Sequence, residues 1–385
     1  MIPYLLVILL ICYLINIYDI GKRQRGRTQW QWTLVVVLIL MAGLRYHVGS
    51  DTINYEEAFK RIPELGDLRI EIDHLSQPLW MLSMSFCKTV FGSFVSFQFF
   101  HAIILNLLLL RFVRRTTQYV FTSFLIIFVV VWWNYSFEIL RESLCVAIYL
   151  NAVLFLRERR FMLYLLLGVI MMGLHWFSFV MIALTPIMLF TRYKYSLPLI
   201  GLGALFLLFF VDNSFFQFLE TYASDVFSGG SLKQIDTYLS QDEGEGRVAL
   251  NLFGFARIFF TFMVLPTYII YYGKNDSRTK DLWNILILCF LFGILQTKLV
   301  IFSRYFNYLN CITIVCVVNM LYMKSVPKGL VRSLYKLFVL IFVINGCMYF
   351  YLPSYNEHRS YIHYNCTHIP YKTIFEEPDP IRESL

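Results

Sequence analysis

Long apolar segments separated by short polar connections make up most of the chain. Each segment is close to the roughly 20 residues that an α-helix needs to span about 30 Å of hydrocarbon. A transmembrane barrel would instead show short segments of alternating polarity, and the sequence does not have this pattern. The sequence therefore predicts an all-α polytopic integral membrane protein, with residues 1–385 forming a single membrane domain.

Composition supports the same class. Of the 385 residues, 58% are hydrophobic and only 15% are charged, whereas a soluble domain carries about 25% charged residues. The first apolar segment, "IPYLLVILLICYLINIY", is followed by the basic stretch "KRQRGR" rather than by a small-residue cleavage site. We therefore interpret it as a retained helix and not as a signal peptide.

The net charge of +8 is concentrated in short connections between apolar segments. Nineteen of the 33 lysines and arginines fall in six clusters, at 22–27, 111–115, 157–160, 192–194, 274–280 and 324–336. Short basic connections are typical of the cytoplasmic side of a membrane protein. No soluble basic face is available for nucleic acid, so nucleic-acid binding is excluded as the role of this charge.

Placing all six clusters on one side predicts about twelve membrane crossings, within a range of about 11–14. They lie near residues 3–19, 30–44, 93–110, 119–134, 139–156, 161–175, 176–191, 196–211, 249–272, 282–297, 304–323 and 334–352. Both termini are then outside the cytoplasm, as are three polar stretches: the loops 45–77 and 212–248 and the tail 353–385. Residues 78–91 could form a further crossing. Because this segment is short and contains Lys88, we favour an amphipathic helix at the outer interface.

Cysteine and histidine spacing gives no metal or disulfide framework. Seven of the eight cysteines lie in or beside apolar segments and are expected to pack there. No Asp-x-Asp pair occurs in an outer loop and no histidines cluster. The sequence predicts neither a metal nor a cofactor.

The stretch "GLRYHVGSDTINYEEAF", residues 43–59, places hydrogen-bonding and ionisable groups directly after the second apolar segment. Candidate site residues here are Arg45, His47, Asp51 and Tyr55. "SDT" can also begin a helix near Ile53, so the alternative is that Asp51 is an ordinary helix cap beside a surface arginine.

Other predicted outer ends carry further charged groups. "NYSFEILRESLCVAIYL" contains Glu138, Arg141 and Glu142, "GLHWFSF" contains His175, and "QTKLVIFSRYFNYLN" contains Arg304 and Tyr305. Arg257 falls in the middle of a predicted crossing. An arginine inside a membrane segment costs about 2.5–3.5 kcal/mol on insertion scales, so it usually pairs or lines a wet cavity. For Arg141 and Arg304 the alternative is a side chain that reaches to the interface, and for His175 it is a hydrogen-bonded turn residue. Arg257 is too deep to reach the interface easily.

Several arginines and a carboxylate at one face indicate an anionic ligand outside the membrane. The arginine guanidinium has donors that match phosphate oxygens. The outer side has no ATP supply, so synthesis there needs an activated substrate such as a sugar on a lipid-linked pyrophosphate. Asp51 could then accept a proton from, or position, the attacking hydroxyl. We expect a neighbouring arginine to lower the pKa of Asp51.

These residues resemble the EpsG family of exopolysaccharide, capsule and O-antigen gene clusters. The resemblance rests on an arginine followed by Gly-x-Asp-Thr and a tyrosine in residues 43–59, on "LRESLCVAIYL", on "GLHWFSF" and on "IPYKTIF". The stretch "GLHWFSF" differs from the family's His-x-Ser turn, because two residues separate His175 from Ser178.

The resemblance implies a bundle similar to GT-C glycosyltransferases and to Wzy-type polymerases in a bacterial inner membrane. Such an enzyme transfers a glycan from undecaprenyl pyrophosphate onto another lipid-linked repeat unit, for O-antigen, capsule or exopolysaccharide. A flippase and a chain-length regulator are the partners it implies. The site residues are then Asp51, Arg45, Arg141 and His175 for catalysis, and Arg304, Tyr55, His47, Arg257 and Tyr305 for substrate binding.

Two alternatives remain open. An O-antigen ligase would share this chemistry but pass the glycan to a different acceptor. A flippase or transporter for lipid-linked glycans would need charged residues at mid-membrane, for which the sequence offers mainly Arg257.

Overall fold

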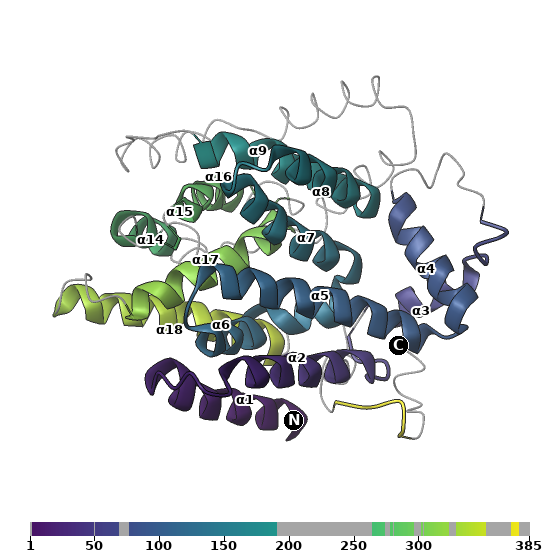
Figure 1. Ribbon diagram of the computed structural model, residues 1–385, viewed down its shortest axis with the longest axis horizontal. Coiled ribbons are helices and arrows are strands. Elements are labelled where there is room, and N and C mark those ends of the chain that lie inside the picture. Colours follow the sequence, from purple (N-terminus) through teal and green to yellow (C-terminus); the bar gives the residue numbers. More distant parts are fainter. Residues whose placement is uncertain are drawn as a thin grey trace, which may run out of the picture.

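The chain folds into a helical bundle in the computed structural model shown in Figure 1. The structure describes residues 2–49, 51–68, 77–190, 264–273, 278–279, 281–295, 302, 304–322, 329–351 and 371–376. Within these residues the only β-type pairing is an isolated bridge between Arg45 and Thr373. The predicted all-α class is therefore confirmed for the described part of the chain.

The elements follow one another as α1 (Ile2–Leu14), η1 (Ile15–Ile20), α2 (Arg27–Gly43), α3 (Thr52–Arg61), α4 (Pro78–Phe91), α5 (Phe94–Thr116), α6 (Val120–Ile127), η3 (Phe128–Trp132), η4 (Asn134–Glu138), α7 (Leu140–Arg157), α8 (Phe161–Leu174), η5 (Trp176–Ser178), α9 (Phe179–Phe190), α14 (Leu265–Gly273), α15 (Leu282–Ile285), α16 (Ile287–Leu295), α17 (Tyr305–Tyr322) and α18 (Leu330–Tyr351). Of these, η1, η3 and η4 are π-helical turns and η5 is a 3₁₀ turn.

These helices occupy the positions that the apolar segments predicted. Three stretches are long and apolar enough to cross a membrane: Ile2–Ile20, Phe94–Thr116 and Tyr305–Tyr322. Four shorter apolar stretches are Val120–Trp132, Phe161–Leu174, Trp176–Phe190 and Leu282–Gly293. The predicted crossing at 196–211 and the loop 212–248 lie outside the described residues, as does most of 249–272. The count of about twelve crossings stays a prediction.

Helix α7 lies at the centre of the bundle. It packs against α5 on one side and α8 on another, and α17 covers a further face. Its side chains are buried almost all round, as expected of a helix enclosed by other helices. The cysteines at 87, 145, 289, 311 and 316 are buried and form no disulfide, which confirms the predicted packing role for these five, whereas Cys12 on α1 is exposed.

Four of the six basic clusters meet at one end of the bundle, which we call the basic end. Arg27 forms an ion pair of 3.1 Å with Asp19 and donates to the carbonyl of Gln118, just beyond α5. Arg157, at the end of α7, donates to the carbonyl of Arg278 over 2.8 Å. The sequence-based placement of these clusters on a common side is therefore reproduced by the packing of the helices.

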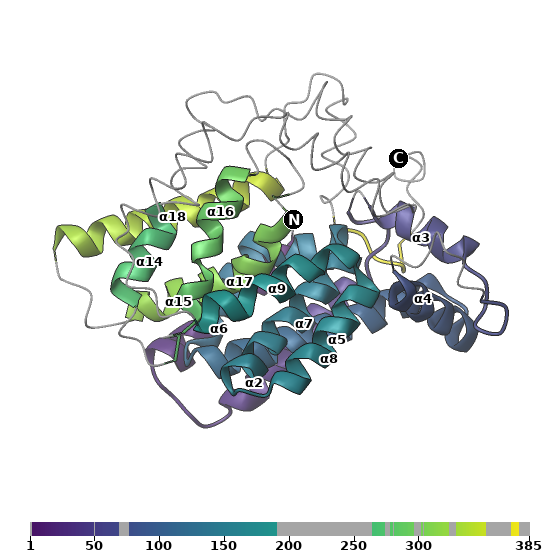
Figure 2. The same cartoon turned by 90° about the horizontal axis from the view of Figure 1, so that it is seen from above.

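The opposite end, which we call the site end, carries α3 and α4 in both Figure 1 and Figure 2. Lys88 of α4 donates to the carbonyls of Lys60 and Ile62 at the end of α3, over 2.9 and 2.6 Å. The predicted helix at 78–91 therefore exists and is attached to α3. Its position at the outer interface stays a prediction.

The meeting of the basic clusters at one end of the bundle can be tested by measuring membrane topology. Reporter fusions after Arg25, Arg114 and Arg159 should all report the cytoplasm, and a fusion at Gly66 should report the opposite side, because short basic connections are retained inside. Alkaline phosphatase and fluorescent protein fusions provide the measurement. Opposite results for Arg25 and Arg114 would contradict the meeting of these clusters at one end.

Candidate functional site

The loop from Leu44 to Asp51 is held by a segment distant in sequence. The amide of Tyr46 donates to the carbonyl of Lys372 over 3.0 Å, and the amide of Ile374 donates to that of Leu44 over 3.0 Å. The hydroxyl of Tyr371 donates to the carbonyl of Met41 over 2.6 Å. Two of the sequence stretches that resemble the EpsG family, residues 43–59 and "IPYKTIF", are therefore neighbours in the fold.

Gly49 allows this loop to lie against η4. Its φ of +106° is in the left-handed region, and a Cβ built on it would come within 2.6 Å of the carbonyl oxygen of Phe137. Only glycine has both the backbone freedom and the absence of a side chain that this contact requires. Next to it, the hydroxyl of Thr52 donates to the carbonyl of Val48 over 2.7 Å. The loop is thus held close to the start of α7.

Replacement of Gly49 by alanine is expected to move this loop away from η4 and to destabilise the protein by about 1–3 kcal/mol, through backbone strain and overlap with Phe137. Thermal unfolding in detergent provides the measurement. Gly66 has no atom within 4 Å of a built Cβ, so Gly66→Ala is the control. Equal melting temperatures for the two variants would contradict this account.

Asp51 stands at the N-cap position of α3, but its side chain does not cap the helix. The side chain of Asn54 forms a hydrogen bond to the carboxylate instead, and the backbone amide of Asp51 donates to Glu138 over 3.4 Å. The helix start near Ile53 is confirmed to within one residue. The alternative that Asp51 is an ordinary capping residue is not supported by these contacts.

The pKa of Asp51 is raised, not lowered. Burial is the largest cause and the negative charge of Glu138 is the second, and together they outweigh the opposing effects of Arg304 and Arg141. Arg304 and Arg141 do lower this pKa as expected, but the predicted net lowering is wrong, because burial and the nearby Glu138 together have the larger effect. A raised pKa makes the ionised Asp51 a stronger base.

A small, partly open cavity lies at the start of α17, beside Arg304, whose charge acts on Asp51. It measures about 10 Å³ and is lined by Glu142, His175, Phe177, Arg304, Tyr305 and Tyr308. A space of this size holds about one water molecule. The described side chains must therefore separate before a larger ligand can enter.

Glu142 joins α7 to α17 at this cavity. The side-chain amide of Asn307 donates to Glu142 Oε1 over 2.8 Å, and the backbone carbonyl of Asn307 accepts from the hydroxyl of Tyr135 over 2.5 Å. Arg141, the preceding residue on α7, donates to the amide oxygen of Gln77. Arg141 and Arg304 both interact electrostatically with Glu142 and His175. The predicted site residues from three separate segments thus meet here.

Tyr55, on α3, lies close to Arg141 and Asp51. Burial raises the pKa of Tyr55 to about 12, against the opposing charge of Arg141. Its ring packs edge-on to Trp80 of α4, with 5.7 Å between ring centroids. Of the predicted site residues, the structure brings together Asp51, Tyr55, Arg141, His175, Arg304 and Tyr305, which we call the charged cluster.

Arg45 lies behind the charged cluster and not on its surface. Its exposed fraction is 1%, it donates to the carbonyl of Ala42, and its guanidinium lies 5.4 Å from the ring centre of Phe137. Burial lowers the pKa of Arg45 to about 10, although Tyr371 and Glu138 favour its charged form. The structure thus places Arg45 as an internal support of the loop.

His47 contacts its neighbour Tyr46 and Glu56 of α3. It has a φ of +45°, its Nε2 lies 2.7 Å from Glu56, and its ring stacks on Tyr46 at 4.2 Å. The hydrogen bond from His47 is the main reason that the pKa of Glu56 falls to about 2. Arg257 lies outside the described residues.

Glu138, Glu142 and Asn307 contact the predicted site residues but were not selected from the sequence. The sequence did offer an indication for Glu142. It follows an arginine at the start of an apolar helix, where a carboxylate that becomes buried needs a partner. Asn307 follows Arg304 by three positions, which places both near one face of α17. Within the described residues, no three His, Cys, Asp or Glu side chains gather as a metal site would require.

The fold and the charged cluster together define a class: a membrane-embedded helical protein with an ionisable site at the end of the bundle opposite its basic clusters. The sequence profile of the EpsG family matches residues 30–372, nearly the whole chain. The protein belongs to the EpsG family, which is associated with polysaccharide biosynthesis. Searches of curated proteins and of solved structures each found no match.

Proposed function

We propose that this protein is a glycan polymerase that transfers an undecaprenyl-pyrophosphate-linked glycan onto another lipid-linked repeat unit at the outer face of a bacterial inner membrane. The observation that carries the proposal is the meeting of two arginines and two carboxylates at the site end: Arg141, Arg304, Asp51 and Glu142. Membership of the EpsG family supports the same reaction class.

Arg141 and Arg304 would hold the pyrophosphate of the donor. Each guanidinium offers two parallel donors to phosphate oxygens, a geometry that a lysine cannot reproduce. Arg141 now donates to the neutral amide of Gln77, a partner that a phosphate can replace with a gain in charge attraction. Tyr305 lines the cavity beside Arg304 and would contact the same substrate.

Asp51 would take the proton from the acceptor hydroxyl. The hydroxyl oxygen of the acceptor sugar forms a bond to the anomeric carbon of the donor, and the bond from that carbon to the phosphate oxygen breaks. Undecaprenyl pyrophosphate leaves as the stabilised anion and the proton moves to Asp51. Burial and Glu138 raise the pKa of Asp51 and so favour its protonation. Tyr55 and His175 would orient the sugars.

The distinguishing experiment measures glycan length in a strain that lacks the gene and carries it on a plasmid. Loss of a polymerase leaves a single repeat unit, whereas loss of a ligase leaves long chains on the lipid carrier. Loss of a flippase traps single units in the cytoplasm. Purified protein in nanodiscs should also convert undecaprenyl-pyrophosphate repeat units into a ladder without any other protein. Accumulation of long lipid-linked chains in the deletion strain would overturn the proposal in favour of a ligase.

A further inference from the structure

An open polar cavity of about 340 Å³ lies at the basic end, far along the bundle from the charged cluster. It is lined by Gln24, Arg27, Thr28, Gln31, Arg114, Thr117, Gln118, Val120 and Arg278. The residues come from the start of α2, the end of α5 and the connection before α15. Segments far apart in the sequence therefore build its wall.

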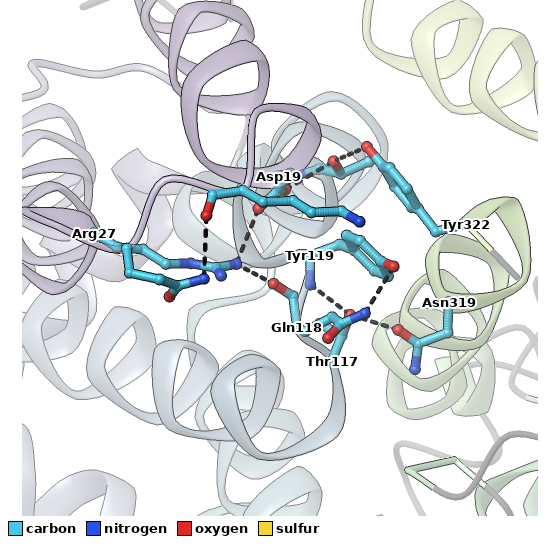
Figure 3. A network of polar contacts seen from close by, with 10 residues as sticks. Asp19, Arg27, Thr117, Gln118, Tyr119, Asn319 and Tyr322 are labelled. Atoms are coloured by element: carbon cyan, nitrogen blue, oxygen red, sulfur yellow. Dashed lines mark hydrogen bonds and ion pairs between the residues drawn. The ribbon is translucent and has the colours of Figure 1, made fainter.

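A network of hydrogen bonds holds this wall in place, as Figure 3 shows. The carboxylate of Asp19 accepts from Arg27 at 3.1 Å and from the amide of Thr122 at 2.7 Å. The hydroxyl of Thr117 donates to Asn319 of α17 at 2.5 Å. The network connects η1, α2, α6 and α17 around the connection 117–119, so the cavity is part of the fixed framework.

The charge of the cavity is positive. Three guanidinium groups line it, from Arg27, Arg114 and Arg278, and Arg27 forms an ion pair with Asp19. Arg114 forms no ion pair or hydrogen bond with the described residues. The N-terminus of α2, beginning at Arg27, adds its partial positive charge beside Thr28. An anion is therefore favoured in this space.

Gln31 provides an independent indication of a polar ligand. Its exposed fraction is 5%, it lines the cavity, and its side-chain amide has no hydrogen-bond partner among the described residues. The amide lines the open cavity, so a ligand oxygen there can accept a hydrogen bond from it. Hydrogen-bond donors of this kind beside arginines match the oxygens of a phosphate group.

We propose that this cavity binds a phosphate group, either the head group of an anionic phospholipid or a soluble phosphate compound. In both cases Arg114 and Arg278 would contact the phosphate oxygens and Gln31 would donate from the floor of the cavity. This site is separate from the charged cluster and does not rest on the proposed polymerase activity.

The test compares two neighbouring arginines at the end of α5. Both side chains are exposed, but Arg114 lines the cavity and Arg115 does not. Full-length wild type, R114Q, Q31L and R115Q are purified in one detergent. The lipid arm measures retention of phosphatidylglycerol against phosphatidylcholine by native mass spectrometry. The soluble arm measures the rise in melting temperature with inorganic phosphate, against chloride at equal ionic strength.

Loss of one arginine contact near an anionic group is expected to weaken binding about fivefold in R114Q. Q31L should also weaken it with no change in charge. R115Q should change it less than about twofold, because Arg115 does not line the cavity and a charge outside it is screened by salt. A response to phosphatidylglycerol alone assigns the site to a lipid, and a response to inorganic phosphate assigns it to a soluble compound. No response in either arm, or equal losses in R114Q and R115Q, would overturn the proposal. Unchanged melting temperatures without ligand show that the variants are folded.

Discussion

Replacement of Arg304 by lysine is expected to abolish most long-chain glycan while the protein still accumulates in the membrane. Lysine keeps the positive charge but loses the planar fork that binds two phosphate oxygens together. Arg304 lines the same cavity as Glu142, His175 and Tyr305. A lysine ammonium at this position cannot donate to two phosphate oxygens in parallel, so part of a bound pyrophosphate is left without a donor. The measurement is glycan length on gels, with protein amount determined by immunoblot. Arg141→Lys should behave in the same way.

Arg61 offers the matched control at the same end of the bundle. Its side chain is 78% exposed and pairs with Glu57 at 2.5 Å on the surface of α3. An exposed pair of this kind contributes little, so Arg61→Lys should leave the glycan unchanged. Normal polymer from both Arg141→Lys and Arg304→Lys would reduce these residues to structural arginines and remove the basis for pyrophosphate binding.

Replacement of Asp51 by asparagine is expected to leave glycans stalled at one repeat unit. Loss of a positioned base typically lowers a rate by about 10²–10⁴-fold, which is enough to eliminate a polymer ladder. The stability of the folded protein should not decrease. Since burial and Glu138 raise the pKa of Asp51, its ionised form is disfavoured in the folded state at neutral pH. A neutral asparagine removes that cost, so the melting temperature should stay the same or rise.

The pH dependence of the wild-type enzyme gives a second readout of the same residue. The active form is the carboxylate, so the rate should fall as the pH falls through the raised pKa of Asp51, above the ordinary value of 3.8. Glu57→Gln is the control, because Glu57 has a 52% exposed side chain on α3. Glycan of normal length from Asp51→Asn would contradict the catalytic role and would leave Glu142 as the carboxylate to test.

The sequence predicted the helices well because each apolar segment has a physical length that matches a membrane. It also predicted that Arg27, Arg114 and Arg157 lie at one end, since the direction of the chain alternates from helix to helix. These are properties of single segments and of their order along the chain.

Pairs between segments could not be predicted in this way. Asn307 forms its hydrogen bond with Glu142 because α17 packs on α7, and no pattern in either segment indicates that the two helices pack together. The burial of Arg45 has the same origin: the sequence places it beside an apolar helix, but the segment around Thr373 is what encloses it. The raised pKa of Asp51 has the same origin, because it comes first from burial and second from Glu138, which is 87 positions away.

The pairing of residues 44–46 with 372–374 bears on the order of events during synthesis. Met41 and its partner Tyr371 are 330 positions apart, so the ribosome makes the loop that carries Asp51 long before it makes the segment that fastens it. Until that segment emerges and docks, the bundle can insert helix by helix while the loop lacks its hydrogen bonds to residues 371–374. In an unfinished copy the start of this loop is therefore unfastened, and under the polymerase proposal its acceptor side is incomplete.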